Sequence, residues 1–158
     1  MKTVLVTFRT RREDRNIIED TLGNVARVIY LEDIGCQGDV LENTNIILTG
    51  SGLDIPLPAL SRMPMLEMVQ TLSAGVEYVP MHAIPEHVII CSNAGANSRA
   101  VAEHVFGLIL AAAKKIVLHD SWMRRGIWRR KEYGLMLEGK TLGILGLGHV
   151  GCEVARIA

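Results

Sequence analysis

The chain has 158 residues, of which 49% are hydrophobic and 22% are charged, a composition typical of a folded globular protein. Its 17 basic residues balance its 17 acidic residues, so no overall field would attract nucleic acid or an anionic membrane surface. The cysteines Cys36, Cys91 and Cys152 are widely spaced and form no C-x-x-C pair, which argues against a disulfide framework or zinc site. We therefore expect a cytoplasmic protein with no metal and with neither nucleic acid nor membrane as a partner.

The N-terminus has only a few apolar residues before charged residues return, so we expect no signal peptide. The most apolar stretch, Val105–Ala113, is too short to span a bilayer and is closed by Lys114. We expect it to be part of a buried helix.

Short apolar or β-branched runs alternate with helical or turn segments along the first part of the chain. Helical spacing of apolar residues covers Arg12–Leu22. The expected strands are Val4–Phe8, Ala26–Leu31, Asn45–Thr49, Met65–Leu72 and His87–Ser92. Strands separated in this way favour an α/β fold with a parallel sheet covered on both faces.

A long apolar helix is expected next, with Asn97 or Ser98 as its N-cap. Apolar side chains cover almost every face over roughly 20 residues, which predicts one buried helix about 30 Å long that crosses from a first lobe to a second. His104 lies in this helix, and a buried histidine with satisfied hydrogen bonds explains it better than a catalytic role. A looser segment, 120–139, follows.

One basic cluster with interleaved tryptophans lies within that looser segment. Its members are Trp122, Arg124, Arg125, Trp128, Arg129, Arg130 and Lys131. Aromatic and basic residues together are compatible with nucleic-acid binding, but a solvated helix end and loop is the simpler interpretation.

The most specific motif closes the sequence. Residues 141–158 read TLGILGLGHVGCEVARIA, which predicts a strand over Thr141–Leu145, a G-x-G-x-x-G turn and the beginning of a helix. This order opens a dinucleotide-binding βαβ unit. A complete unit also needs an acidic residue about 20 positions further on to hold the ribose. That position lies beyond Ala158, so we expect the chain to hold half of a cofactor site.

Each glycine of the turn has its own role in such a unit. Gly146 allows the tight turn, Gly148 lets the backbone approach a pyrophosphate, and Gly151 lets the helix pack on the strand. The N–H groups around His149 and Val150 would face the phosphates.

A competing motif overlaps the beginning of this region. Gly134–Thr141 reads GLMLEGKT and matches the phosphate-binding pattern G-x-x-x-x-G-K-[ST]. That loop needs a helix immediately after it, whereas the strand-like TLGIL follows Lys140, and Glu138 is a poor neighbour for an anion. A P-loop nucleotide hydrolase is therefore the weaker alternative.

Three segments in this order resemble the NAD-dependent D-2-hydroxyacid dehydrogenases, a family that includes the glyoxylate/hydroxypyruvate reductases. They are SAGVEYVP (73–80), NSRAVAEHVFGLILAAAKK (97–115) and TLGILGLGHVG (141–151). The resemblance implies a flavodoxin-like parallel-sheet substrate domain (1–97), followed by a crossover helix and the start of a Rossmann NAD-binding domain (98–158). It further implies NAD or NADP as cofactor, a small 2-oxo or 2-hydroxy acid as substrate, and a homodimer.

The resemblance also assigns roles to single residues. Ala74 and Gly75 match the turn whose backbone N–H groups hold the substrate carboxylate, and Asn97 matches an asparagine near the substrate. Ser98 matches a cofactor contact, and Val101 a residue that packs on the nicotinamide. The expected cofactor-binding residues are thus Ser98, Val101, Gly146, Gly148, His149, Val150 and Gly151. An ordinary turn after a strand and a plain helix N-cap are the alternative explanations for Ala74–Gly75 and Asn97.

The sequence departs from the family pattern at two places. His149-Val150 replaces the common Arg-Ile pair, so a fixed positive charge beside the pyrophosphate is missing or depends on pH. Gly50-Ser51-Gly52 stands where some relatives carry an arginine that contacts a substrate phosphate. A phosphorylated substrate is therefore less favoured.

The family's catalytic arginine, acidic residue and histidine would lie downstream of Ala158. We therefore expect no catalytic residue within the chain, and the N-terminal portion of an oxidoreductase that is inactive by itself. A non-catalytic NAD-sensing or interaction protein of the same fold is the alternative.

Overall fold

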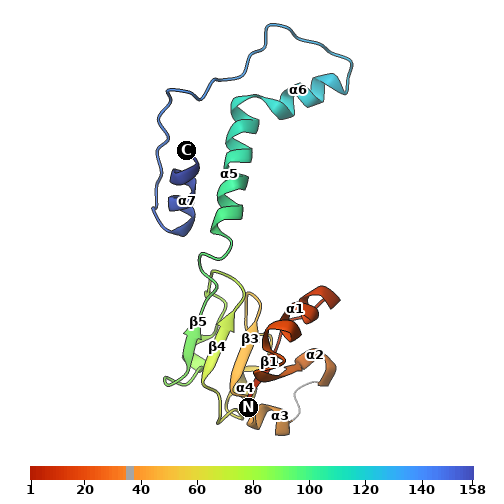
Figure 1. Ribbon diagram of the computed structural model, residues 1–158, viewed down its shortest axis with the longest axis vertical. Helices are drawn as coiled ribbons and strands as arrows, with labels where there is room; N and C mark the ends of the chain where they lie inside the picture. Colours follow the sequence, from red (N-terminus) through yellow and green to blue (C-terminus); the bar gives the residue numbers. More distant parts are fainter. Residues whose placement is uncertain (35–37) are drawn as a thin grey trace. The chain divides into compact units, whose positions relative to one another are not determined.

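The computed structural model describes residues 1–34 and 38–158, so Cys36 lies outside the described residues. The chain divides into two compact units, Met1–Ala94 and Gly95–Ala158 (Figure 1). The division lies close to the 97/98 boundary expected from the sequence. None of the helices in the described ranges combines the length and the apolar character that crossing a membrane requires.

A parallel sheet of five strands forms the first unit, with spatial order β2-β1-β3-β4-β5 (Figure 1). Its strands are β1 (Lys2–Val6), β2 (Ala26–Tyr30), β3 (Ile46–Thr49), β4 (Met68–Thr71) and β5 (Ile89–Cys91). Its helices are α1 (Arg12–Leu22), α2 (Leu31–Ile34), α3 (Gly38–Glu42), α4 (Leu57–Leu60) and the 3-10 helix η1 (Met81–Ala83). The predicted α/β class and helix α1 are confirmed. The strands shift by a few residues, and Leu31 opens α2 instead of closing a strand.

The strand register explains how the sheet builds its main core. Leu5 pairs with Ile29 on one side and with Ile47 on the other, Ile47 pairs with Val69, and Val69 pairs with Ile90. This apolar row crosses every strand, and its members from the three central strands are fully buried. Burying each such side chain stabilises the fold by roughly 1.5–3 kcal/mol.

Three helices make up the second unit: α5 (Ser98–Ala113), α6 (Ile116–Met123) and α7 (His149–Ile157). The prediction of one helix through the whole apolar stretch is wrong, because the chain breaks at Lys115, which has a left-handed φ of 54°. The returning segment explains the break. The N–H of Leu135 donates to Ala113 O (2.6 Å), and Lys115 forms an ion pair with Glu132. These contacts occupy the carboxyl end of α5, where a continued helix would lie. The hydrogen bond from the ammonium of Lys115 also lowers the pKa of Glu132.

The prediction that this apolar helix is buried is also wrong. Among the residues of α5, only Ala102 is buried, and Leu108 is 59% exposed. Among the described residues of the second unit, Val154 of α7 is the only other buried apolar side chain. A helix that is apolar on every face needs cover on every face, and within this unit α5 packs mainly against α7.

The predicted strand over Thr141–Leu145 is not formed. The segment is irregular and pairs with no strand in the described part of the chain, and Leu142 and Leu145 are exposed. A single extended segment gains no ladder hydrogen bonds, so its β-type sequence does not make it a strand. Helix formation after the turn is confirmed by α7, which begins at His149.

An ion-pair network joins α1 to α2 in the first unit. The guanidinium of Arg15 donates to Glu32 (2.7 Å) and to Asp33 (2.8 Å) and lies 4.2 Å from the ring centroid of Tyr30. Hydrogen bonds from Thr10 and then Arg15 lower the pKa of Glu32 from 4.5 to about 2. The network therefore stabilises the native state fully above pH 4.5, and this stabilisation is lost as the pH falls toward 2.

We predict that Arg15→Met lowers the melting temperature by several degrees at neutral pH, because it leaves Glu32 and Asp33 without their cation. The difference from the unchanged protein should shrink between pH 5 and pH 2, as measured by circular dichroism. Arg124→Met serves as the matched control, since Arg124 pairs with Asp120 on an exposed helix surface. An equal effect of both substitutions, or one independent of pH, would contradict the prediction.

Candidate functional site

The first candidate site is the turn that follows β4 at the carboxyl edge of the sheet. In open α/β sheets, ligands bind at this edge. Hydrogen bonds from side-chain and backbone donors to the carbonyl oxygens of the turn fix its conformation. Thr71 Oγ1 donates to Ser73 O (2.9 Å), Ser73 Oγ donates to Gly75 O (2.7 Å), and the N–H of Asn93 donates to Ser73 O (3.0 Å).

The amide groups of this turn are left free. Within the described chain, the N–H groups of Ala74, Gly75 and Val76 donate to no acceptor. Ala74 is exposed and Gly75 is half-buried, so small side chains leave these donors open to solvent. A run of free backbone N–H groups in a turn is a suitable place for an anion such as a carboxylate.

The second candidate site is the glycine turn before α7, whose geometry gives each glycine a distinct task. Gly146 has φ of +93°, which side chains rarely adopt, and it sharply reverses the chain. A Cβ placed on Gly151 would lie 2.2 Å from the carbonyl oxygen of Gly146, so the first turn of α7 rests on the backbone of the loop. A Cβ on Gly148 would meet no atom within 4 Å. The turn is therefore closed on its inner side at Gly151 and open at Gly148.

The amino end of α7 presents unpaired donors beside that opening. Gly148 is the N-cap and contributes no side-chain cap, while the first backbone hydrogen bond within the helix runs from Cys152 to Gly148 O (2.9 Å). The N–H groups of His149, Val150 and Gly151 thus have no acceptor in the described chain. Unpaired N–H groups and the helix dipole together make such an end a binding place for phosphate.

The first turn of α5 lies beside this end of α7. The two helices pack side by side, and the chain enters both at the same end (Figure 1). The contact is made by Gly95, which has φ of +92° and on which a Cβ would lie 2.7 Å from Cδ2 of His149. Ser98 Oγ donates to Gly95 O (2.7 Å) and fixes the bend. Sequence reasoning missed Gly95, although a glycine just before a helix start was a usable signal.

The structure brings together the residues that the sequence assigned to the cofactor. Ser98 and Val101 are one helical turn apart on α5 and therefore on one face, and Val101 is exposed. Asn97 is the N-cap residue of α5, one of the two positions expected, but its side chain forms no cap hydrogen bond. Asn97 is exposed, and its side chain is available to a ligand.

Two other expectations are settled by the second unit. His104 is exposed, so it is not the buried histidine that the sequence suggested, because α5 lacks cover on that side.

After Lys140 the chain is irregular, and the next helix begins only at His149. A P-loop needs its helix directly after the lysine, so the structure argues against a nucleotide hydrolase.

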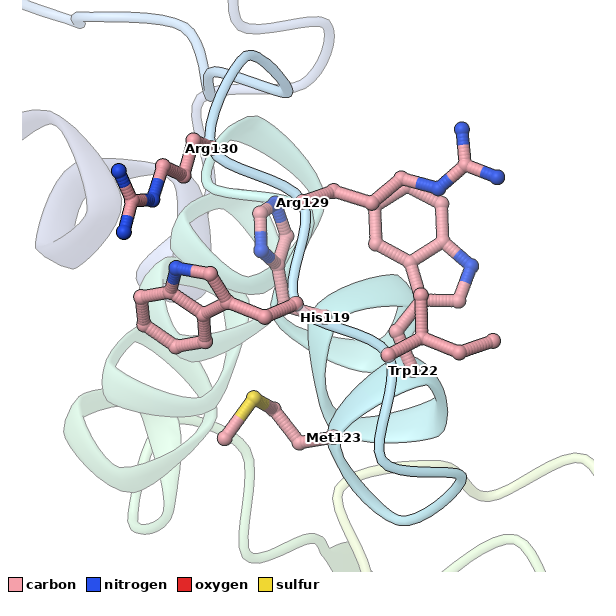
Figure 2. A pocket seen from close by; sticks show the side chains of 7 residues that line it. His119, Trp122, Met123, Arg129 and Arg130 are labelled. Atoms are coloured by element: carbon pink, nitrogen blue, oxygen red, sulfur yellow. The ribbon is translucent and has the colours of Figure 1, made fainter.

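The basic cluster forms part of a cavity of about 600 Å³ on the second unit. Figure 2 shows side chains from α6 and from the segment after it facing this cavity. Its lining residues are His119, Trp122, Met123, Ile127, Trp128, Arg129 and Arg130. The guanidinium of Arg129 lies 5.1 Å from the ring centroid of Trp122, whose ring also contacts His119. None of the residues that the sequence assigned to substrate or cofactor lines it.

Comparison with known proteins supports the assignment of residues 146–151 as a dinucleotide-type glycine turn. Residues 106–158 match the family described as "D-isomer specific 2-hydroxyacid dehydrogenase, NAD binding domain". Over these residues the chain therefore resembles the NAD-binding domain of the D-2-hydroxyacid dehydrogenases. The α/β fold, with a parallel-sheet unit followed by the start of a Rossmann NAD-binding domain, agrees with this family.

Individual relatives of this family cover most of the chain. A D-3-phosphoglycerate dehydrogenase of Methanocaldococcus jannaschii is 34% identical over 120 residues, which are 75% of this chain and 23% of that enzyme. The chloroplastic D-3-phosphoglycerate dehydrogenase 2 of Arabidopsis thaliana is 39% identical over 162 residues, which cover 94% of this chain and 26% of that enzyme.

A solved structure extends the match to the fold. The glycerate dehydrogenase related protein of Thermoplasma acidophilum is 34% identical with a TM-score of 0.67, and the match covers 98% of this chain and 50% of that one. The chain thus spans about half of this solved relative and about a quarter of the curated enzymes.

Proposed function

We propose that these residues form the N-terminal part of an NAD(P)-dependent D-2-hydroxyacid dehydrogenase, which transfers a hydride between the cofactor and a small 2-oxo or 2-hydroxy acid. The observation that carries this proposal is the glycine turn, which is closed at Gly151 and open at Gly148. Such a turn admits a pyrophosphate to the backbone while holding the helix firmly behind it.

The residues present fit a dinucleotide. The free N–H groups of His149, Val150 and Gly151 would bind the pyrophosphate, with Gly148 leaving its path open. Ser98 and Val101 on the neighbouring helix would contact the cofactor, and the apolar side chain of Val101 suits the face of a nicotinamide ring. The nicotinamide supplies or accepts the hydride when bound.

The turn after β4 would hold the substrate. The N–H groups of Ala74 and Gly75 would donate to the substrate carboxylate, and this pairing with an anion is stronger than a neutral hydrogen bond. Asn97, whose side chain is exposed, is the third residue that the family resemblance assigns to the substrate. None of these residues can donate a proton to the carbonyl oxygen at neutral pH, so in this proposal the proton donor lies outside the chain.

The relatives suggest two kinds of substrate and two cofactors. The enzymes of Methanocaldococcus and Arabidopsis are named for a phosphorylated acid, and the Thermoplasma protein for an unphosphorylated one. Among the solved relatives, a D-lactate dehydrogenase is complexed with NAD and a glyoxylate/hydroxypyruvate reductase with NADP. We infer NAD or NADP as the cofactor, because the discriminating acidic position is not among these residues.

We predict that Gly148→Val in the complete protein abolishes NADH binding without lowering thermal stability, because its side chain enters only the space that a pyrophosphate would occupy. Fluorescence titration with NADH, together with a melting curve, checks this. Gly151→Ala is the matched contrast, since its Cβ would collide with the carbonyl of Gly146 and should lower stability.

Lys140→Ala completes the same experiment by testing the P-loop alternative. Lys140 is exposed and precedes an irregular segment, so NADH affinity should be unchanged. Retained NADH binding in Gly148→Val, together with ATP binding that depends on Lys140, would overturn the dehydrogenase proposal.

A polypeptide of these 158 residues alone should show no 2-oxo acid reductase activity, because it holds no proton donor for the substrate. The measurement is NADH oxidation with glyoxylate or hydroxypyruvate by a homogeneous sample. Sustained turnover would show that the assignment of the missing catalytic group is wrong.

We further propose that the complete protein is a homodimer in which exposed apolar residues of the second unit are covered. Val117 of α6 is 76% exposed, and Trp128, which lines the cavity described above, is 71% exposed. Surfaces of this kind are typical of protein interfaces. Sedimentation equilibrium should give a dimer that Val117→Glu dissociates, and a monomer at all concentrations would contradict this.

The cytoplasm is the proposed location, because the unpaired thiols Cys91 and Cys152 would persist in a reducing compartment. Cell fractionation that recovers the protein in an oxidising compartment would contradict this.

A further inference from the structure

A cavity of the first unit lies where the chain changes direction across the sheet. From β1 the chain passes to β2 on one side, and it then returns past β1 to β3 on the other side. In open α/β sheets, ligands bind in the crevice at the carboxyl ends of the strands at such a point. The cavity here measures about 480 Å³, and its lining residues follow these three strands: Thr7, Arg9, Leu31, Glu32 and Asp54. None of them belongs to the turn after β4 or to the glycine turn.

Thr7 gives this cavity a buried polar group that the protein itself does not use. The residue is 6% exposed, and its backbone N–H donates to Leu48 O (3.0 Å), which holds it beside β3. Its hydroxyl oxygen Oγ1 is buried and has no hydrogen-bond partner in the described chain. Buried hydroxyl groups are rarely left unpaired, because losing water without gaining a new hydrogen bond costs free energy. Since Thr7 lines the cavity, the cavity is where a partner for this hydroxyl would be bound.

Two opposite charges line the same cavity without being paired. Within the described ranges, neither Arg9 nor Asp54 forms an ion pair. Glu32, by contrast, is already engaged, because it accepts hydrogen bonds from the N–H of Thr10 (3.2 Å) and from the guanidinium of Arg15 (2.7 Å). A guanidinium binds a carboxylate strongly, and a carboxylate does the same for an ammonium group. The cavity therefore matches a ligand that carries one charge of each sign.

We propose that this cavity binds a small zwitterion of the α-amino-acid class, at a site separate from the proposed substrate and cofactor sites. The carboxylate of the ligand pairs with Arg9 and accepts a hydrogen bond from Thr7, while its ammonium group pairs with Asp54. Leu31 provides an apolar wall for the side chain of the ligand. The volume suits this class, since sites for small molecules measure about 300–1,000 Å³. Binding here goes beyond the proposed function and does not depend on it.

L-Alanine and two of its derivatives test whether the cavity binds both charges. N-acetyl-L-alanine lacks the ammonium group, and L-alaninamide lacks the carboxylate. With the complete protein, saturation-transfer NMR titrations should show that L-alanine binds at least tenfold more tightly than either derivative, because each loses one charged hydrogen-bonding group. Equal binding of one derivative would show that only one charge is bound, and this would overturn the inference. Absence of L-alanine binding at millimolar concentrations would also overturn it.

Thr7→Val distinguishes a hydroxyl that binds a ligand from one that serves the fold. Valine has nearly the same shape and removes no hydrogen bond within the described chain, so the melting temperature should be unchanged or higher. The affinity for L-alanine should fall about tenfold. Thr44→Val is the matched control, because the buried hydroxyl of Thr44, before β3, donates to Val40 O (2.8 Å). It should lower the melting temperature and leave the affinity for L-alanine unchanged.

The two charged residues are tested separately. Arg9→Gln should weaken L-alanine about tenfold and leave L-alaninamide unchanged, whereas Asp54→Asn should weaken L-alanine and leave N-acetyl-L-alanine unchanged. Unchanged binding of L-alanine in Thr7→Val and Arg9→Gln would place the ligand elsewhere and overturn the inference. An active reductase with this result keeps the proposed function intact. An inactive complete protein that binds L-alanine through Thr7 and Arg9 supports the inference and overturns the proposed function.

Discussion

The contact between Gly151 and the carbonyl oxygen of Gly146 is the constraint on which the second unit depends. A Cβ on Gly151 would lie only 2.2 Å from the carbonyl oxygen of Gly146, so no side chain fits there. The first turn of α7 therefore packs directly on the backbone of the glycine turn. The first N–H groups of α7 have no acceptor in the described chain, and a Cβ on the neighbouring Gly148 would meet no atom within 4 Å. Gly95, just before α5, lies close to the side chain of His149, so the start of α5 is near these donors.

The first unit builds its binding turn by a different route. There the hydroxyl groups of Thr71 and Ser73 and the backbone N–H of Asn93 satisfy carbonyl oxygens of the turn, and the backbone N–H groups remain free. Both sites therefore present main-chain donors to an anion, one at a loop after a strand and one at a helix start.

The sequence predicted those elements whose pattern is satisfied locally or by neighbouring strands. Helix α1 has its predicted bounds, and each predicted strand of the first unit is present because parallel partners complete its hydrogen bonds. The segment Thr141–Leu145 has an equally suitable composition but remains irregular without a partner. The break at Lys115 was not predictable from apolar pattern alone, since contacts from Glu132 and Leu135, far along the chain, end the helix.

By itself, the sequence determined the α/β class and the position of the glycine turn before α7, because glycine spacing and apolar periodicity are properties of the chain's own backbone and side chains. It also marked Ala74, Gly75, Ser98 and Val101 through a family resemblance. Only the tertiary structure decided that the start of α5 lies against the start of α7 and that His104 and Leu108 are exposed. These features depend on packing between segments and on side-chain direction, which no spacing of residue types specifies.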